Sequence, residues 1–247
     1  MSRHTRGGAG TRRGSCEMSD ISLCRQDPTS AEDGREFWRR VLLLAGGVTA
    51  IPRWTLEPVP GVAVHEARIP DELAAALRRL ANEVAVPLGS VLLTAHAKVI
   101  AAVSGEREIA IGYAVTGRPA LPCRLTTAPR SWRELLHATH RAESELLSHV
   151  DFPLADLRRE LGCVKPLFET VFELVGADTR VGPYAGGRGE LAEETVLQVG
   201  FVEHDELLLQ LRYKTDVIDA DCAARIAGYH LTALALIAAD PDAEHAR

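Results

Sequence analysis

Several features that mark common protein classes are missing from this sequence. The five cysteines are an odd number and show no CxxC spacing, so they indicate neither a disulfide framework nor a zinc site. Outside the extreme N-terminus there is no block of Lys and Arg, and the net charge is -6, which argues against a nucleic-acid partner. No apolar run reaches the roughly 18 residues that span a bilayer, and the N-terminus lacks the hydrophobic segment of a secretory signal. We therefore expect a cytoplasmic protein without a nucleic-acid or membrane partner.

The histidines show no catalytic pattern. There are nine of them, no two are adjacent, and none is followed by Asp-Gly. His96 lies in a long apolar segment and could face a ligand, but we expect it to be a core residue. His137 and His140 lie three apart on a predicted helix, and with Glu134 or Glu143 this spacing could hold a metal. Because no third ligand is evident elsewhere, we expect a solvated helix face and no metal.

The composition is that of a folded chain. Apolar residues make up 46% and charged residues 25% of the 247 positions, enough for one large domain that buries roughly 70% of its unfolded surface. Residues 1–34 are rich in Gly, Ser, Thr and Arg without periodicity, so we predict a disordered tail, in which Met18 could be an alternative start of translation. Residues 35–242 form the predicted domain, and 243–247 a second tail.

Hydrophobic periodicity predicts helices and strands in mixed order, and so an α+β or α/β sandwich in which helices cover a mixed β-sheet. Ser131 and Glu134 form a capping box, and Asp219 caps the last helix. The Gly-rich loop at 178–194 lacks the context of a phosphate-binding loop. The expected helices are 36–44, 70–84, 88–103, 131–150, 154–161 and 219–240, and the expected strands are 62–69, 108–115, 168–176, 195–203 and 206–215.

One long stretch resembles a known family. SHVDFPLADLRRELGCVKPLFETVFEL, from Ser148 to Leu174, is similar to a run in the condensation domains of nonribosomal peptide synthetases. EFWRRVLLLAGG, SVLLTAHAKVIAAVSGEREIAIGYAVTGR and LQLRYKTDVID resemble further segments of that family in the same order. The resemblance covers about residues 36–242. It implies the C-terminal lobe of a domain with the chloramphenicol-acetyltransferase-like fold.

The resemblance also indicates which residues belong to the motifs of the family. Asp151 is expected to cap the short helix that Pro153 begins. Whether Arg158 pairs with acidic side chains or meets a phosphopantetheine arm stays open, with pairing in solvent as the expectation. The residues that match family motifs, with structural or binding roles, are Gly117, Arg118, His149, Asp151, Pro153, Arg158 and Pro166.

Two parts of the family pattern are absent. The catalytic signature HHxxxDG does not occur, and Gly117-Arg118-Pro119-Ala120 runs directly into Leu121-Pro122-Cys123-Arg124, where the family carries an inserted helix. A proton-transfer group must lie within hydrogen-bond reach of its proton. The resemblance therefore implies a free-standing, truncated lobe that has no catalytic residue and binds no cofactor directly.

Several functions remain possible for such a lobe. It could be a noncatalytic module that binds a synthetase or a carrier protein bearing phosphopantetheine. It could instead be the C-terminal half of a split condensation acyltransferase that forms amide or ester bonds, with a partner supplying the HHxxxDG lobe. Both predict an exposed apolar face for a partner lobe or for self-association. A third possibility is that the lobe is a decaying remnant without function.

Overall fold

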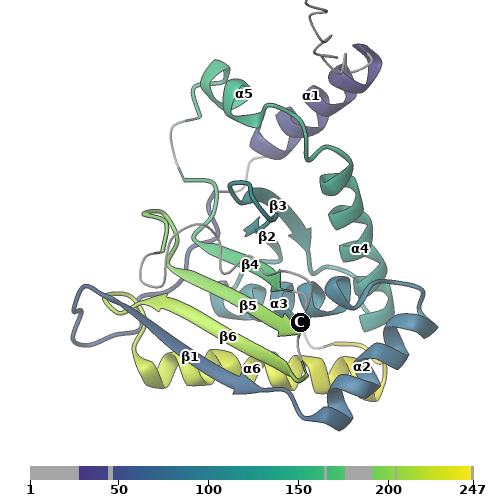
Figure 1. Cartoon of the computed structure of the whole chain (residues 1–247), viewed down its shortest axis with the longest axis vertical. Helices are drawn as coiled ribbons and strands as arrows, with labels where there is room; N and C mark the ends of the chain where they lie inside the picture. Colours follow the sequence, from purple (N-terminus) through teal and green to yellow (C-terminus); the bar gives the residue numbers. More distant parts are fainter. Residues whose placement is uncertain (1–27, 44–46, 164–165, 176–190, 204, 246–247) are drawn as a thin grey trace, which may run out of the picture.

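The computed structural model describes residues 28–43, 47–163, 166–175, 191–203 and 205–245 (Figure 1). Residues 1–27, which hold most of the predicted N-terminal tail and Met18, lie outside this part of the chain. The same is true of most of the Gly-rich loop, of Gly46 and of Lys165.

A mixed sheet of six strands, in the order β1-β6-β5-β4-β2-β3, forms the centre of the protein. β4 runs parallel to β2 and β5, whereas the β1–β6, β5–β6 and β2–β3 pairs are antiparallel. This confirms the expected mixed sheet. The strands are β1 (Val62–Arg68), β2 (Glu108–Tyr113), β3 (Leu121–Thr126), β4 (Thr170–Val175), β5 (Leu197–Glu203) and β6 (Leu207–Lys214).

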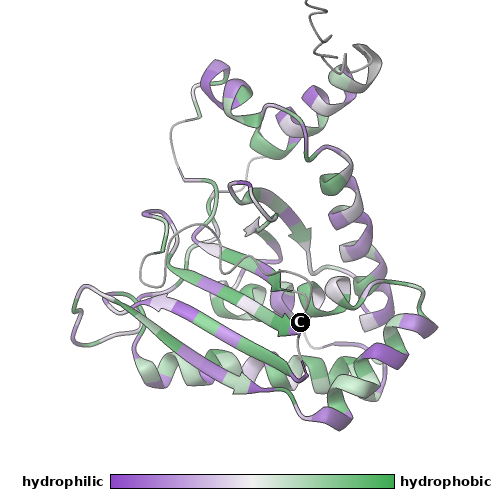
Figure 2. Ribbon diagram, in the orientation of Figure 1, coloured by the Kyte–Doolittle hydropathy of each residue, from purple (hydrophilic) through white to green (hydrophobic). Residues whose placement is uncertain are grey.

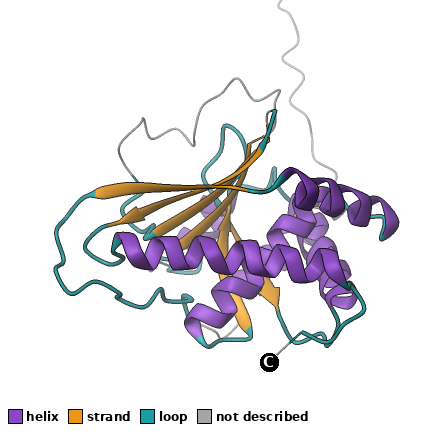
Figure 3. Cartoon of the chain, turned by 90° about the horizontal axis from the view of Figure 1, so that it is seen from below, coloured by secondary structure: helices purple, strands orange, loops and turns teal. Residues whose placement is uncertain are grey.

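The long helices pack on one face of this sheet, and α3 lies between the strands, α4 and α6 (Figures 1 and 3). Residues 89–97 of α3 are buried without exception, which explains why its sequence is apolar almost all round. The helices are α1 (Pro28–Leu43), α2 (Asp71–Glu83), α3 (Leu88–Ser104), α4 (Trp132–Ser148), α5 (Leu154–Glu160) and α6 (Ala220–Ala239). The predicted capping box of α4 and the Asp219 cap of α6 are confirmed.

The first helix begins earlier than expected. α1 starts at Pro28, so residues 28–34 are helical and do not belong to a disordered tail. The reason is a tertiary contact at Gly34, which is buried against the segment between α4 and α5. A Cβ atom at Gly34 would lie 3.0 Å from Phe152 Cδ2. Glycine lowers the intrinsic stability of a helix, but at this position the missing side chain allows α1 to pack against Phe152.

Residues 243–245 of the predicted C-terminal tail contact the domain. Their backbone and that of Pro241 bind the N-terminal turn of α4, where helical N–H groups lack partners within the helix. Arg133 N donates to Pro241 O at 2.7 Å, and Trp132 N donates to Ala243 O at 3.3 Å.

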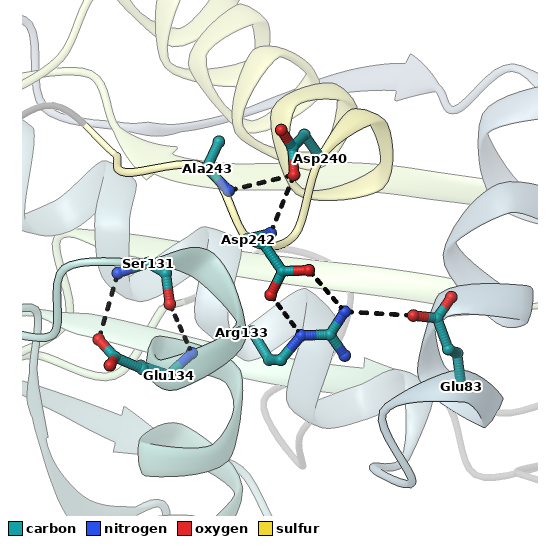
Figure 4. A network of polar contacts seen from close by, with 7 residues as sticks. All are labelled: Glu83, Ser131, Arg133, Glu134, Asp240, Asp242 and Ala243. Carbon is teal, nitrogen blue, oxygen red and sulfur yellow. Dashed lines mark hydrogen bonds and ion pairs between the residues drawn. The ribbon is translucent and has the colours of Figure 1, made fainter.

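Side chains reinforce this closure (Figure 4). Arg133 donates from Nε and Nη2 to the two carboxylate oxygens of Asp242, at 2.6 and 3.0 Å, and from Nη2 to Glu83 Oε1 at 3.2 Å. Asp240 Oδ1 accepts hydrogen bonds from the backbone N–H groups of Asp242 and Ala243. The end of the described chain therefore joins α2, α4 and α6.

β3 is a strand that periodicity did not identify. It forms an antiparallel hairpin with β2 and is the last strand of the sheet, with Gly112 opposite Pro122. Proline lacks a backbone donor, so it is tolerated in an edge strand such as this one.

Candidate functional site

The structure brings several of the predicted motif residues together where α1, the β2–β3 connection and the α4–α5 turn meet. Arg118 Nη1 donates to Val150 O at 2.8 Å, and Arg118 Nη2 forms an ion pair with Asp151. Trp38 Nε1 donates to His149 O at 3.0 Å. We call this cluster, completed by Phe37, the motif junction: Phe37, Trp38, Arg118, His149, Val150 and Asp151.

The bonds at the motif junction fix the local fold. The ring of His149 stacks on Phe37, with a centroid distance of 4.7 Å. Gly117 has φ of +75°, a backbone conformation that favours glycine and directs Arg118 back toward the α4–α5 turn. The chemistry here is that of ion pairing and main-chain hydrogen bonding. It holds three elements together that are distant in the sequence.

The expectation that Asp151 caps α5 is wrong. Pro153 occupies the N-cap position, no side chain caps the helix there, and the Asp151 carboxylate binds Arg118 instead. A charged donor at hydrogen-bond distance is a stronger partner than a backbone N–H. Arg158 lies half-buried on α5, and Pro166 is exposed beyond it.

A second polar cluster is buried among α3, α4 and β2, and the sequence analysis did not assemble it. Ser90 Oγ lies 3.0 Å from His140 Nδ1 and donates to Glu143 Oε2, while Tyr113 OH donates to Glu143 Oε1 at 2.6 Å. Burial and the neighbouring Glu143 raise the pKa of Tyr113 and that of the Cys123 thiol. Both side chains are therefore held in their protonated forms.

Ser90, His140 and Glu143 are the residue types of an acyl-transfer triad, but their bonds run in another order. In a triad the acid orients the histidine, and the histidine accepts the serine proton. Here Ser90 gives its single proton to Glu143, so His140 Nδ1 must be the donor toward Ser90. Ser90 also has no exposed surface. The cluster thus satisfies a buried carboxylate and does not form a nucleophile.

Replacing Ser90 with alanine should therefore destabilise the folded protein without affecting its activity. We expect the free energy of unfolding to fall by about 1–3 kcal/mol, because Glu143 loses a buried donor. Denaturant titration measures this loss, with the exposed Ser144→Ala as the control. A fluorophosphonate probe should not label Ser90 in the folded protein, and specific labelling would contradict this structural role.

His96 is confirmed as a core residue, and it pairs with a second buried histidine. His96 Nδ1 lies 3.2 Å from His230 Nε2, and His230 Nδ1 lies 2.8 Å from Ile226 O. Because a carbonyl only accepts, His230 Nδ1 carries a proton, and Nε2 accepts from His96. Burial lowers the pKa of His230 to about 4 and that of His96 well below its ordinary value. Both rings are neutral near pH 7.

Residues that could bind a metal do not gather in the described part of the chain. No group of three or more His, Cys, Asp and Glu side chains lies close enough there. The acids near His137 and His140 have other partners, since Glu134 belongs to the capping box and Glu143 to the buried cluster.

A shallow groove of about 520 Å³ lies at the other end of the sheet from the motif junction, near the start of α6. Its walls include Leu56, Val59, Tyr213 and Asp219. No base, nucleophile and oxyanion donor converge there. Asp219 is already the cap of α6, where the Cys222 N–H lowers the pKa of its carboxyl.

The sheet also has a face that the described helices leave open beside β1, β6 and β5 (Figures 1 and 3). Alternate residues of β6, namely Leu209, Leu211 and Tyr213, point into the core, so the residues between them point the other way. Gln210 Nε2 donates to Glu66 Oε1 at 2.7 Å on this side. We define the open sheet face as Val62, Val64, Glu66, Leu208, Gln210, Arg212 and Lys214, of which Arg212 lies opposite Val64 and is itself buried.

Comparisons with known proteins identify the class of this fold. No family model matches the chain. Tyrocidine synthase 3 of Brevibacillus parabrevis is 30% identical over 199 residues, which are 69% of this chain and 3% of that protein. The first condensation domain of the calcium-dependent antibiotic synthetase has a TM-score of 0.66 at 22% identity, over 87% of this chain and 52% of that chain. The X-domain solved in complex with OxyB, from teicoplanin biosynthesis, has a TM-score of 0.70 at 18% identity, over 87% of this chain and 54% of that chain.

The fold is the α+β lobe of the chloramphenicol-acetyltransferase-like class, as the resemblance implied. The chain is a condensation-domain-like protein. It spans about half the length of the solved domains that it matches and a few per cent of the synthetases.

Proposed function

We propose that this chain acts in nonribosomal peptide biosynthesis as a noncatalytic binding module for a carrier protein or a synthetase module. The likeness to condensation domains and synthetases supports the biosynthetic role. One observation supports the proposal that the module is noncatalytic. The lobe fold is present, but the sequence has no HHxxxDG, and the buried Ser90, His140 and Glu143 satisfy one another.

The open sheet face supports binding as the function. Val62 is 37% and Val64 is 53% exposed, and both lie in β1, an edge strand of the central sheet. Exposed apolar side chains that gather on one face often mark an interaction site. Among structural neighbours, the X-domain was solved with another protein, OxyB. In that structure a domain of similar fold is therefore in a complex with a second protein.

Binding to a purified carrier protein tests the proposal. We expect the full-length chain to bind a phosphopantetheinylated carrier protein in isothermal titration calorimetry, and Val64→Glu to weaken this binding at least about tenfold, since a charge enters an apolar contact. Leu147→Glu, on the exposed side of α4, is the matched control and should bind normally. If both variants lost the same binding affinity, or if the chain bound no carrier protein, the proposed role as a binding module would be contradicted.

A second function is favoured by the same open sheet face. A separate lobe with HHxxxDG could dock there and form a split condensation acyltransferase. The chain alone, incubated with a loaded carrier protein and an amine acceptor, should give no amide product. Product that appears only after a purified HHxxxDG lobe is added would select the split enzyme. Product from the chain alone would contradict both functions.

A further inference from the structure

The outer side of α6 is unusual for a helix at the surface of a protein. From Ile226 to Ala239 the sequence contains no Asp, Glu, Lys or Arg. The inner side is buried on the sheet and on α3, through Ile226, His230, Leu234 and Ile237 among others. A helix with one buried face normally carries charged residues on the opposite face. The residues of this outer stripe are Gly228, Tyr229, Thr232, Ala235, Leu236 and Ala239.

The stripe is exposed within the described part of the chain. Tyr229 is 48% and Leu236 is 52% exposed. Figure 3 shows α6 as the long helix in front, and Figure 2 shows mainly hydrophobic and neutral colours along it. By length and composition this helix could also cross a membrane, and 44% of its apolar window is buried inside the described fold.

The stripe is complementary to itself when two copies of α6 pack antiparallel. Arg225 precedes the uncharged segment and Asp240 follows it. The register that sets Arg225 opposite Asp240 of a second copy also sets Tyr229 opposite Leu236, with Thr232 close to the twofold axis. Each large apolar side chain thus meets another, and each charge meets its opposite. Gly228 and Ala235 carry little side chain, so the two helices can approach closely.

Arg225 is available for such a pair. Within the described part of the chain its guanidinium donates to Cys222 Sγ at 2.9 Å, and its only carboxylate neighbour is the α6 cap Asp219, which it attracts without a hydrogen bond. Asp240 Oδ1 accepts from two backbone N–H groups, which leaves lone pairs of the carboxylate for a partner.

We propose that a second copy of this chain docks on the outer stripe of α6, with the two α6 helices antiparallel. One helix face is smaller than the roughly 800 Å² per partner of a standard stable interface, so the dimer should be weak, on the order of micromolar. The open sheet face lies on the opposite side of the sheet. Dimerisation through α6 therefore leaves the proposed partner surface accessible.

Sedimentation velocity of the full-length chain tests the dimer. We expect a monomer–dimer equilibrium between about 1 and 100 μM, and Leu236→Glu or Tyr229→Glu should shift it at least about tenfold toward monomer, because each new carboxylate then faces a large apolar side chain of the second copy and is buried without a partner. Leu147→Glu on α4 should leave the equilibrium unchanged. A monomer throughout this range, or equal shifts in all three variants, would overturn the proposal.

Cross-linking tests the antiparallel register. In the Thr232→Cys variant, a short bismaleimide should join the two new thiols, which lie close to the twofold axis. Ser144→Cys on α4 and the parent chain give the background from the natural cysteines. Equal yields at positions 232 and 144 would overturn the register. A monomer that binds lipid vesicles through α6 would overturn the second copy as the occupant of the stripe.

Discussion

Replacing Trp38 with alanine is expected to lower the free energy of unfolding by about 3–5 kcal/mol, the range for removing a buried tryptophan. Trp38 is fully buried in α1, where it packs edge-on against Phe37 at a ring distance of 4.8 Å. Its Nε1 also donates to His149 O. The substitution therefore removes both the apolar contact and the bond that hold α1 on the motif junction.

Denaturant titration of three variants separates these contributions. Trp38→Phe keeps most of the apolar contact and loses the hydrogen bond, so it should cost about 1 kcal/mol beyond the small change in packing. Arg39→Ala, at the exposed neighbouring position, should change the free energy of unfolding by less than about 0.5 kcal/mol. A loss below 1 kcal/mol in Trp38→Ala would show that α1 does not depend on this anchor.

Lowering the pH from about 6.5 to about 4 is expected to destabilise the folded protein by about 3 kcal/mol through His230 alone. An unfolded histidine binds a proton below pH of about 6.5, whereas burial lowers the pKa of His230 to about 4. Between these values the unfolded chain binds more protons, so stability falls as the pH falls. His96 adds to the loss in the same direction, because burial and His230 lower its pKa as well.

The double variant His96→Leu/His230→Leu should flatten this pH dependence. Both histidines are removed together, because a single substitution would leave the other ring without its partner. Urea titrations at half-unit steps from pH 7 to pH 4 measure the slope. His137→Leu, on the half-exposed side of α4, should keep the slope, since the buried pair remains. Hydrogen bonds lower the pKa of the Asp219 and Asp242 carboxyls, so most of their stabilisation is lost below this window, and the part lost near pH 4 is common to all variants. If stability depended on pH as steeply in the double variant as in the parent chain, the pH dependence could not be assigned to the His96–His230 pair.

Local sequence patterns predicted a helix boundary correctly where the contacts that fix it lie within the same short stretch of sequence. Ser131 and Glu134 cap α4 because both partners lie within one helical turn of each other. The start of α1 was predicted wrongly, and the packing of the residues after Asp240 was not predicted, for the opposite reason. Gly34 contacts Phe152, and Arg133 contacts Asp242, at separations that no local pattern contains.

The polar clusters could be recognised in the sequence only in part. Glu143 lies on the same helical face as Leu135, Thr139 and Leu146, and this position was the available signal that it is buried. His230 lies four residues after Ile226 and faces the core, although the apolar pattern pointed to Leu231. A buried acid or histidine needs a partner, but its own helix does not reveal which one.

The sequence by itself determined the order of the elements except β3, the caps of α4 and α6, the likeness to condensation domains and the absence of HHxxxDG, because these are properties of neighbouring residues. Only the tertiary structure decided which side chains meet. Arg118 pairs with Asp151, Ser90 with Glu143, and His96 with His230, across 33, 53 and 134 positions of the chain. Such pairs form when packing of the sheet and helices brings distant segments into hydrogen-bond range. That packing also leaves the open sheet face and the outer side of α6 as the surfaces for partners.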